Sequence, residues 1–181
     1  MSNPTPAPAP NVVPDPAPES NPPAVRPADP AEFERLRWIE FESDLLYLEV
    51  GIGPFSEDDT ANHLPVAAAV YAVGDPAVGF VSLEIVDGVA HVDQVSVLPD
   101  HGRKGLGRAL LEAAVGWAAA SGYPALTLVT YRDVPWNAPF YRTLGFEEVT
   151  DLSPGLAAIR SHEREAGLDA FGPRVAMRRV L

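Results

Sequence analysis

Apolar residues recur in short runs or at every second position through the middle of the chain, which is the pattern of β-strands. Three such segments, Val66 to Val73, Val78 to Val86 and Ala90 to Leu98, are rich in β-branched and aromatic residues. The breaks between them, Gly74-Asp75-Pro76 and Asp87-Gly88, carry the residues typical of tight turns. The pattern therefore predicts three antiparallel strands joined as a β-meander.

A helical pattern follows the third of these strands, with apolar residues at Leu106, Leu110, Ala113, Ala114 and Trp117. Gly122 is suited to the left-handed residue that ends a helix, and Pro124 prevents continuation. The next segment, Ala125 to Tyr131, has the composition of a buried strand. A strand, a crossover helix and a second strand in this order predict parallel pairing of 90–98 with 125–131.

Weaker patterns lie on both sides of this centre. Before it we expect a short strand at 24–27, a helix over 31–48 that begins at Asp29-Pro30, and a short helix from the capping box at 56–59. After it we expect a helix over 135–144, a strand over 146–152, a helix over 156–168 and a strand over 174–180. These elements predict a mixed α+β fold, with a sheet of six or seven strands and helices on both faces.

The first 23 residues differ from the rest, because Pro, Ala, Asn and Ser dominate them without any helical or strand period. Such a segment has too little apolar surface to offset the entropy of ordering. We expect a disordered, Pro-rich arm (1–23) ahead of one domain (24–181). The arm also lacks the basic and apolar regions of a secretion signal, so a cytoplasmic location is expected.

Composition and charge exclude several classes of function. The chain has 181 residues, a formal net charge of −12 and no Cys, so disulfides and a cysteine nucleophile are ruled out. The negative charge argues against a nucleic-acid partner, and no apolar run is long enough to span a membrane. The 4 His residues lack the helical pairing of zinc sites, so no metal is expected.

The strongest chemical signal lies where the third meander strand leads into the helix. Residues 101–108 there read His-Gly-Arg-Lys-Gly-Leu-Gly-Arg, with 3 cations among 3 glycines. The free N–H groups of a helix start bind anions, and glycine lets a ligand approach the backbone. A Walker loop is excluded because Arg108 follows Gly107, and a dinucleotide fingerprint because Leu110 stands where its third Gly belongs.

Residues 95–111, Val-Ser-Val-Leu-Pro-Asp-His-Gly-Arg-Lys-Gly-Leu-Gly-Arg-Ala-Leu-Leu, resemble the acyl-coenzyme A pyrophosphate motif of the GNAT superfamily of N-acetyltransferases. A second motif of that superfamily resembles residues 137–146, Asn-Ala-Pro-Phe-Tyr-Arg-Thr-Leu-Gly-Phe. Residues 25–29 also look like its opening strand. The resemblance covers roughly residues 24–181, and the two motifs stand in the expected order and spacing.

The resemblance implies that acetyl-CoA is the cosubstrate and that two parallel strands splay apart to receive it. It assigns the pyrophosphate to the backbone amides of Arg103, Lys104, Gly105, Leu106, Gly107 and Arg108. Pantetheine would pair with the backbone of Val95 and Val97, and Asn137 would contact the coenzyme. The superfamily usually has Gln or Arg where Gly102 stands, so Arg103, Lys104 and Arg108 are the candidates to supply that phosphate contact.

The implied reaction is direct attack of a primary amine on the thioester, in a ternary complex. An alkylamine is almost entirely protonated at neutral pH, so a base must remove a proton. Acids on these strands often have this role in the superfamily, and the candidates are Asp93, then His91, then Glu84. Strand alternation predicts that His91 and Asp93 share one face with Val95 and Val97. Tyr141 matches the superfamily's general acid, which protonates the thiolate.

Two other interpretations stay open from the sequence. The domain is either an enzyme or a module that binds acyl-CoA without turnover, as a sensor or partner. In a third interpretation, the Pro-rich arm is the functional part and the domain is its scaffold. We expect a small-molecule or peptide amine as the acceptor. Dimers are common among the proteins that this chain resembles, so a homodimer is one of the alternatives that the sequence leaves open.

Overall fold

A single seven-stranded sheet organises the chain in the computed structural model, which describes residues 24–55 and 63–181. The expected arm and the expected helix at 56–59 lie outside the described residues. The strand order is β1-β2-β3-β4-β5-β7-β6. The strands are β1 (Val25–Pro27), β2 (Ala69–Gly74), β3 (Ala77–Val86), β4 (Val89–Val97), β5 (Ala125–Tyr131), β6 (Glu147–Val149) and β7 (Arg174–Val180).

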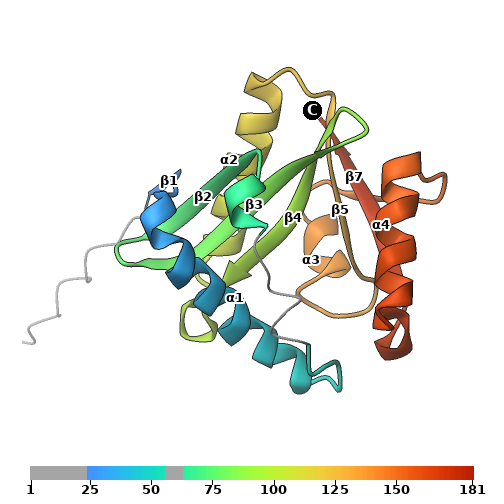
Figure 1. The fold of residues 1–181 in the computed structure, drawn as a ribbon, viewed down its shortest axis with the longest axis horizontal. Helices are drawn as coiled ribbons and strands as arrows, with labels where there is room; N and C mark the ends of the chain where they lie inside the picture. The colour runs from blue at the N-terminus through green and yellow to red at the C-terminus, as the bar shows by residue number, and fades with distance from the viewer. Residues whose placement is uncertain (1–23, 56–62) are drawn as a thin grey trace, which may run out of the picture.

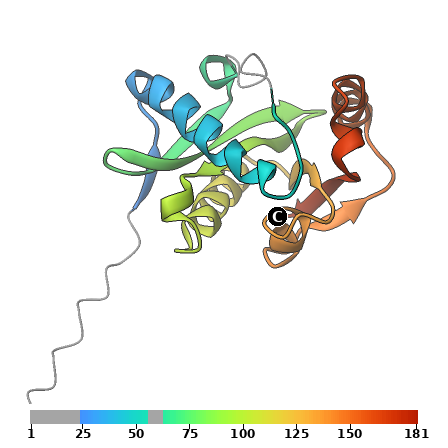
Figure 2. The ribbon, with the colours of Figure 1, turned by 90° about the horizontal axis from the view of Figure 1, so that it is seen from below.

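Two helices cover each face of the sheet (Figures 1 and 2). On the front face of Figure 1 lie α1 (Phe33–Leu48) and α4 (Pro154–Glu165), and behind the sheet lie α2 (Leu106–Ala120) and α3 (Ala138–Arg142). Short 3₁₀ turns occur at Pro30–Glu32, Leu64–Val66, Pro99–His101 and Leu168–Phe171. Among the residues described, no helix is long and apolar enough to cross a membrane.

The local signals that predicted turns and caps are confirmed. Asp87 and Gly88 both have positive φ, 51° and 73°, as the hairpin between β3 and β4 requires. Asp29 caps the first helical turn in a capping box with Glu32. Gly122, with φ of 80°, follows the end of α2. The predicted bounds of β5 and β7 are correct, whereas α3 and β6 are shorter than expected.

The parallel pairing of β4 with β5 is also confirmed, and it is short. It joins Ala90, His91 and Val92 to residues 126–128 and goes no further, although β4 continues to Val97. On its other side β4 stays paired with β3 as far as Val97. The two parallel strands therefore separate after Val92.

The prediction that His91, Asp93, Val95 and Val97 share one face is wrong. The register between β3 and β4 shifts at one point, so that Asp93 has no partner and forms a β-bulge. Beyond this extra residue, Val95 and Val97 pack in the same cluster as Val92, on the α2 side. His91 and Asp93 lie on the opposite face, near Glu163 of α4 and His63 respectively.

The core is divided by the sheet. The larger cluster fills the side of α2 and α3, with Leu83, Leu110, Leu128, Phe146 and Met177 at its centre. A smaller cluster under the first half of α1 joins Leu36, Ile39 and Phe80, among other residues. Glu40, in the middle of α1, is also buried, and beyond it Tyr47 packs against a third cluster formed by Ile52, Tyr131 and Val134.

Candidate functional site

The separation of β4 from β5 leaves backbone groups of β4 without a strand partner. The amide of Leu98 donates to the carbonyl of Val78, 2.9 Å away, so Leu98 forms a hydrogen-bonded pair across to β3. Backbone groups alternate in direction along an antiparallel strand. The N–H and C=O groups of Val95 and Val97 therefore point away from β3, toward the edge that β5 has left.

The loop between β4 and α2 continues this open edge. Among the described residues, no acceptor meets the N–H groups of residues 103–108. Arg103 and Gly105 have positive φ, 57° and 80°, which turns the chain so that these amides lead into the first turn of α2. A diphosphate fits such a set of free donors at the positive end of a helix dipole.

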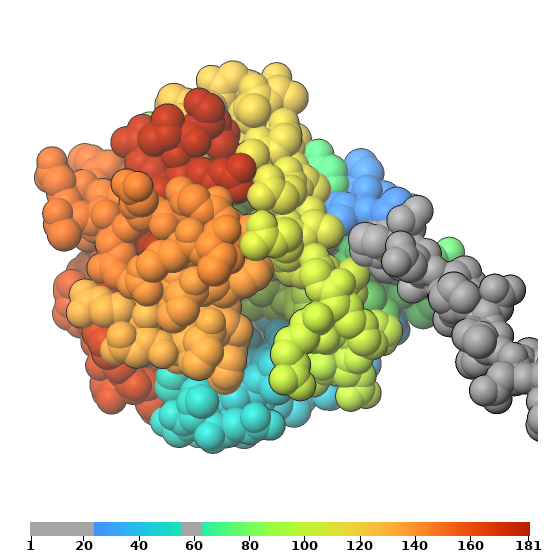
Figure 3. All heavy atoms as spheres, turned by 180° about the vertical axis from the view of Figure 1, so that it is seen from behind, coloured from blue at the N-terminus to red at the C-terminus, as the bar shows by residue number. Residues whose placement is uncertain are grey.

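The cations of the loop are exposed and available to a ligand. The Nζ of Lys104 donates to the backbone oxygen of Asp100, 2.8 Å away, and Arg108 lies 3.4 Å from the hydroxyl of Thr143 on the far side of the gap. Figure 3 shows the surface from this side, where a hollow separates the yellow-green β4–α2 loop from the orange region around α3.

Tyr141 lies on α3, and Asn137 is the residue that precedes this helix. Tyr141 is only 8% exposed and packs against Phe140 and Phe146 at ring-centroid distances of 5.5 and 5.9 Å. Burial raises the pKa of its hydroxyl, so the phenol holds its proton at any ordinary pH. Asn137 is buried, and its amide meets the hydroxyl of Tyr47 on α1 at 2.9 and 3.0 Å. Tyr47 is thus a site residue that the sequence did not indicate.

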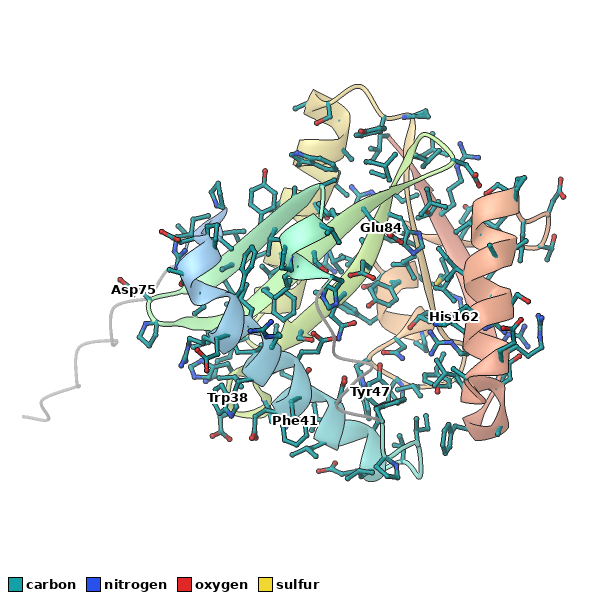
Figure 4. The ribbon with its side chains drawn as sticks, in the orientation of Figure 1. Trp38, Phe41, Tyr47, Asp75, Glu84 and His162 are labelled. Carbon is teal, nitrogen blue, oxygen red and sulfur yellow. The ribbon has the colours of Figure 1, made fainter. Side chains whose placement is uncertain are left out.

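The three candidate bases have different surroundings on the α1 side of the sheet. His91 is buried, which lowers its pKa to about 4. Because Thr127 donates to the carbonyl of Ala90, its hydroxyl accepts from Nδ1 of His91, 2.8 Å away. Glu84 is opposite His91 on β3, where burial raises its pKa (Figure 4). Asp93 is more exposed and accepts a hydrogen bond of 3.1 Å from Ser82.

Two further titratable residues stand beside Asp93. The Nε2 atom of His63 lies 3.5 Å from a carboxylate oxygen of Asp93 and 3.8 Å from one of Glu40, on α1. Burial raises the pKa of Glu40 to about 8, and the nearby carboxylates of Asp44 and Asp93 add to this. The only sequence signal for Glu40 is that it interrupts the apolar period of the helix. In the part of the chain that the structure describes, no such group has the arrangement of a metal site.

Comparison with known proteins identifies the family. The sequence model of the acetyltransferase (GNAT) family matches residues 28–146, about two thirds of the chain, including both motifs. The chain belongs to the GNAT acetyltransferase family. The match ends at Phe146, so α4 and β7 lie outside it.

Solved structures show the same GNAT fold at low sequence identity. An acetyltransferase of the family from Staphylococcus aureus Mu50 is 16% identical with a TM-score of 0.65, covering 87% of this chain and 98% of that one. The ribosomal-protein-S18-alanine N-acetyltransferase of Escherichia coli is 19% identical with a TM-score of 0.60, covering 87% and 92%. The PaiA N-acetyltransferase of Thermoplasma acidophilum, in complex with coenzyme A, is 16% identical with a TM-score of 0.62, covering 87% and 98%.

Proposed function

We propose that this GNAT protein transfers an acetyl group from acetyl-CoA to a primary amine by direct attack in a ternary complex. The observation that carries the proposal is the continuity of the open edge of β4 with the free amides at 103–108. An amide-bearing chain can pair with the open edge as an added strand would, while its diphosphate binds at the helix start. Family membership supports the same assignment.

Each end of the proposed substrate meets a different part of the chain. The amides of residues 103–108 bind the diphosphate, and Arg103, Lys104 and Arg108 supply positive charge around it. The backbone of Val95 and Val97 pairs with pantetheine. This orientation brings the thioester to the gap, between Tyr141 on one side of the sheet and Asp93 on the other.

The reaction forms a C–N bond and breaks the C–S bond of the thioester. The amine loses one proton, and the leaving thiolate gains one. Tyr141 is the proton donor, because its hydroxyl stays protonated and its ring belongs to the cluster against which Val95 and Val97 pack. Asp93 is one of the residues that accept the proton of the amine, since it lies at the bulge where the strands separate. His91 and Glu84 lie one step further from the gap, along the paired part of the sheet.

The test is calorimetric titration of the full chain with acetyl-CoA, followed by a coenzyme A release assay. The release assay uses a panel of polyamines, aminoglycosides, amino acids and peptides as acceptors. We expect binding and amine-dependent release. Binding with silence across the panel would favour a module that binds acyl-CoA without turnover, and absence of binding would refute the proposal.

A further inference from the structure

Helix α1 exposes apolar side chains and buries a carboxyl group, an arrangement that folding alone does not favour. Trp38 and Phe41 point outward and are 45% and 40% exposed (Figure 4). Glu40 is only 6% exposed, and a carboxylate oxygen of it lies 3.8 Å from Nε2 of His63. A helix on a sheet gains stability from the opposite arrangement. Burying a carboxyl group without a partner costs free energy, so the burial of Glu40 indicates a functional role for this residue.

Neither Glu40 nor its neighbour His63 is satisfied by the protein. Within the described ranges, the Oε2 atom of Glu40 and the Nε2 atom of His63 are buried and have no hydrogen-bond partner. They lie 3.8 Å apart, and Nε2 is 3.5 Å from the carboxylate of Asp93. One imidazole nitrogen therefore stands between two carboxyl groups that come from different elements, α1 and β4.

The position of this cluster relates it to the proposed reaction. Asp93 is the bulge residue, and β4 and β5 separate directly after Val92. Two residues further along β4, the backbone of Val95 faces the gap. The cluster thus lies on the α1 face of the sheet, at the end of the gap opposite the cationic loop.

We propose that His63 is the catalytic residue that receives the proton of the acceptor ammonium, and that Glu40 and Asp93 position its ring. The inference rests on the proposed acetyl transfer and names the atom that accepts the proton. An N–H bond of the ammonium breaks, the proton moves to Nε2, and the freed electron pair attacks the acyl carbon. The imidazolium is then stabilised by the two carboxyl groups beside it before it returns the proton to solvent.

The other titratable groups around the cluster agree with this role. Asp44 lies one turn beyond Glu40 on α1, and burial raises its pKa to about 6. Glu84 and His91 approach from β3 and β4. The charged groups that raise the pKa of Glu40 are Asp44 and Asp93, and both are acidic, which favours the approach of a cationic amine.

The experiment compares His63→Asn with wild type in the full chain, using two acceptors. The first is a strongly basic alkylamine that reacts in the release assay, and the second is its β,β,β-trifluorinated analogue, whose amine is largely neutral at pH 7. If His63 removes a proton, kcat/KM should fall about 30-fold or more for the basic amine and about 3-fold or less for the analogue. The loss for the basic amine should also shrink as the pH rises toward its pKa.

Further variants separate a chemical role from a structural one. Glu40→Gln should show the same selective loss to a smaller extent, about 3- to 10-fold, with unchanged acetyl-CoA affinity. His162→Asn and Glu42→Gln are the matched controls, and neither should change either rate. His63→Gln serves as a second variant, and a thermal melt with acetyl-CoA titration verifies that each variant is folded.

The outcomes distinguish this inference from the proposed function. Suppose that the wild type transfers the acetyl group. If kcat/KM then falls in neither His63 variant, or falls equally for both acceptors, the role of His63 is refuted and the proposed acetyl transfer is not. If wild type binds acetyl-CoA but acetylates no amine, the proposed function fails and the inference fails with it.

Discussion

Replacing Tyr141 with Phe tests the proposed proton donor with the smallest possible change. The substitution removes one oxygen and keeps the ring, which packs against Phe140 and Phe146. Among the described residues, nothing hydrogen-bonds to this hydroxyl, so its loss leaves no protein group unsatisfied. We therefore expect the free energy of unfolding to change by less than about 1 kcal/mol, against roughly 3–5 kcal/mol for Tyr141→Ala.

The expected effect on catalysis is larger than the effect on stability. Loss of a general acid lowers turnover by 10-fold or more, which is about 1.4 kcal/mol or more of activation free energy. The pKa of Tyr141 is raised by burial, so its phenol stays protonated as the pH rises. Any loss of wild-type activity between roughly pH 8 and 10 must therefore come from another group.

The assay measures coenzyme A release at saturating acceptor and, separately, acetyl-CoA binding by calorimetry. Tyr141→Phe should keep its affinity for acetyl-CoA and lose turnover. Tyr123→Phe is the matched control, since Tyr123 is also partly buried against an aromatic ring, that of Trp117 at 5.6 Å, but lies away from the gap. Unchanged turnover in Tyr141→Phe would remove this residue from the mechanism.

Two further predictions follow from burial and backbone geometry. Burial raises the pKa of Glu40 from 4.5 to about 8, so the wild type should lose stability relative to Glu40→Gln as the pH rises from about 4.5 to 8, on the order of a few kcal/mol. Urea unfolding at pH 5 and pH 9 measures this loss. An equal difference in unfolding free energy between the two proteins at both pH values would contradict the prediction. Gly105→Val should cost about 1–2 kcal/mol and weaken acetyl-CoA binding, because φ is 80° there although no atom lies within 4 Å of the added Cβ. Gly116→Ala, in equally open space inside α2, should instead raise the melting temperature and leave binding unchanged.

The sequence was most informative where short-range chemistry decides the structure. Asp87-Gly88 predicted a hairpin because both residues accept positive φ, and Asp29 predicted a helix start because its carboxylate caps free amides. The glycines and cations of the loop at 101–108 are adjacent in the sequence, so anion binding could be predicted there without knowledge of the fold. The ends of α3 and β6 were less accurate, since contacts with the rest of the domain decide where such short elements stop.

The acceptor side could not be predicted in the same way. Alternation along β4 predicted one face for His91, Asp93, Val95 and Val97, but the residue pattern contains no sign of the extra residue at the bulge. The contact of Tyr47 with Asn137 joins positions 90 residues apart. In the sequence, Glu40 is only a polar residue at an apolar position of the helical period. Its neighbours in the cluster, His63 and Asp93, come from a loop and a strand.

The sequence alone thus determined the family, the sheet with its helices, and the loop at the start of α2, because each depends on residues that are neighbours along the chain or on strong periodicity. Only the tertiary structure decided which backbone groups of β4 are left open and which carboxyl groups meet His63. Both depend on the register between strands and on the packing of α1 across them. Those relations arise from long-range burial, which no local spacing of residues encodes.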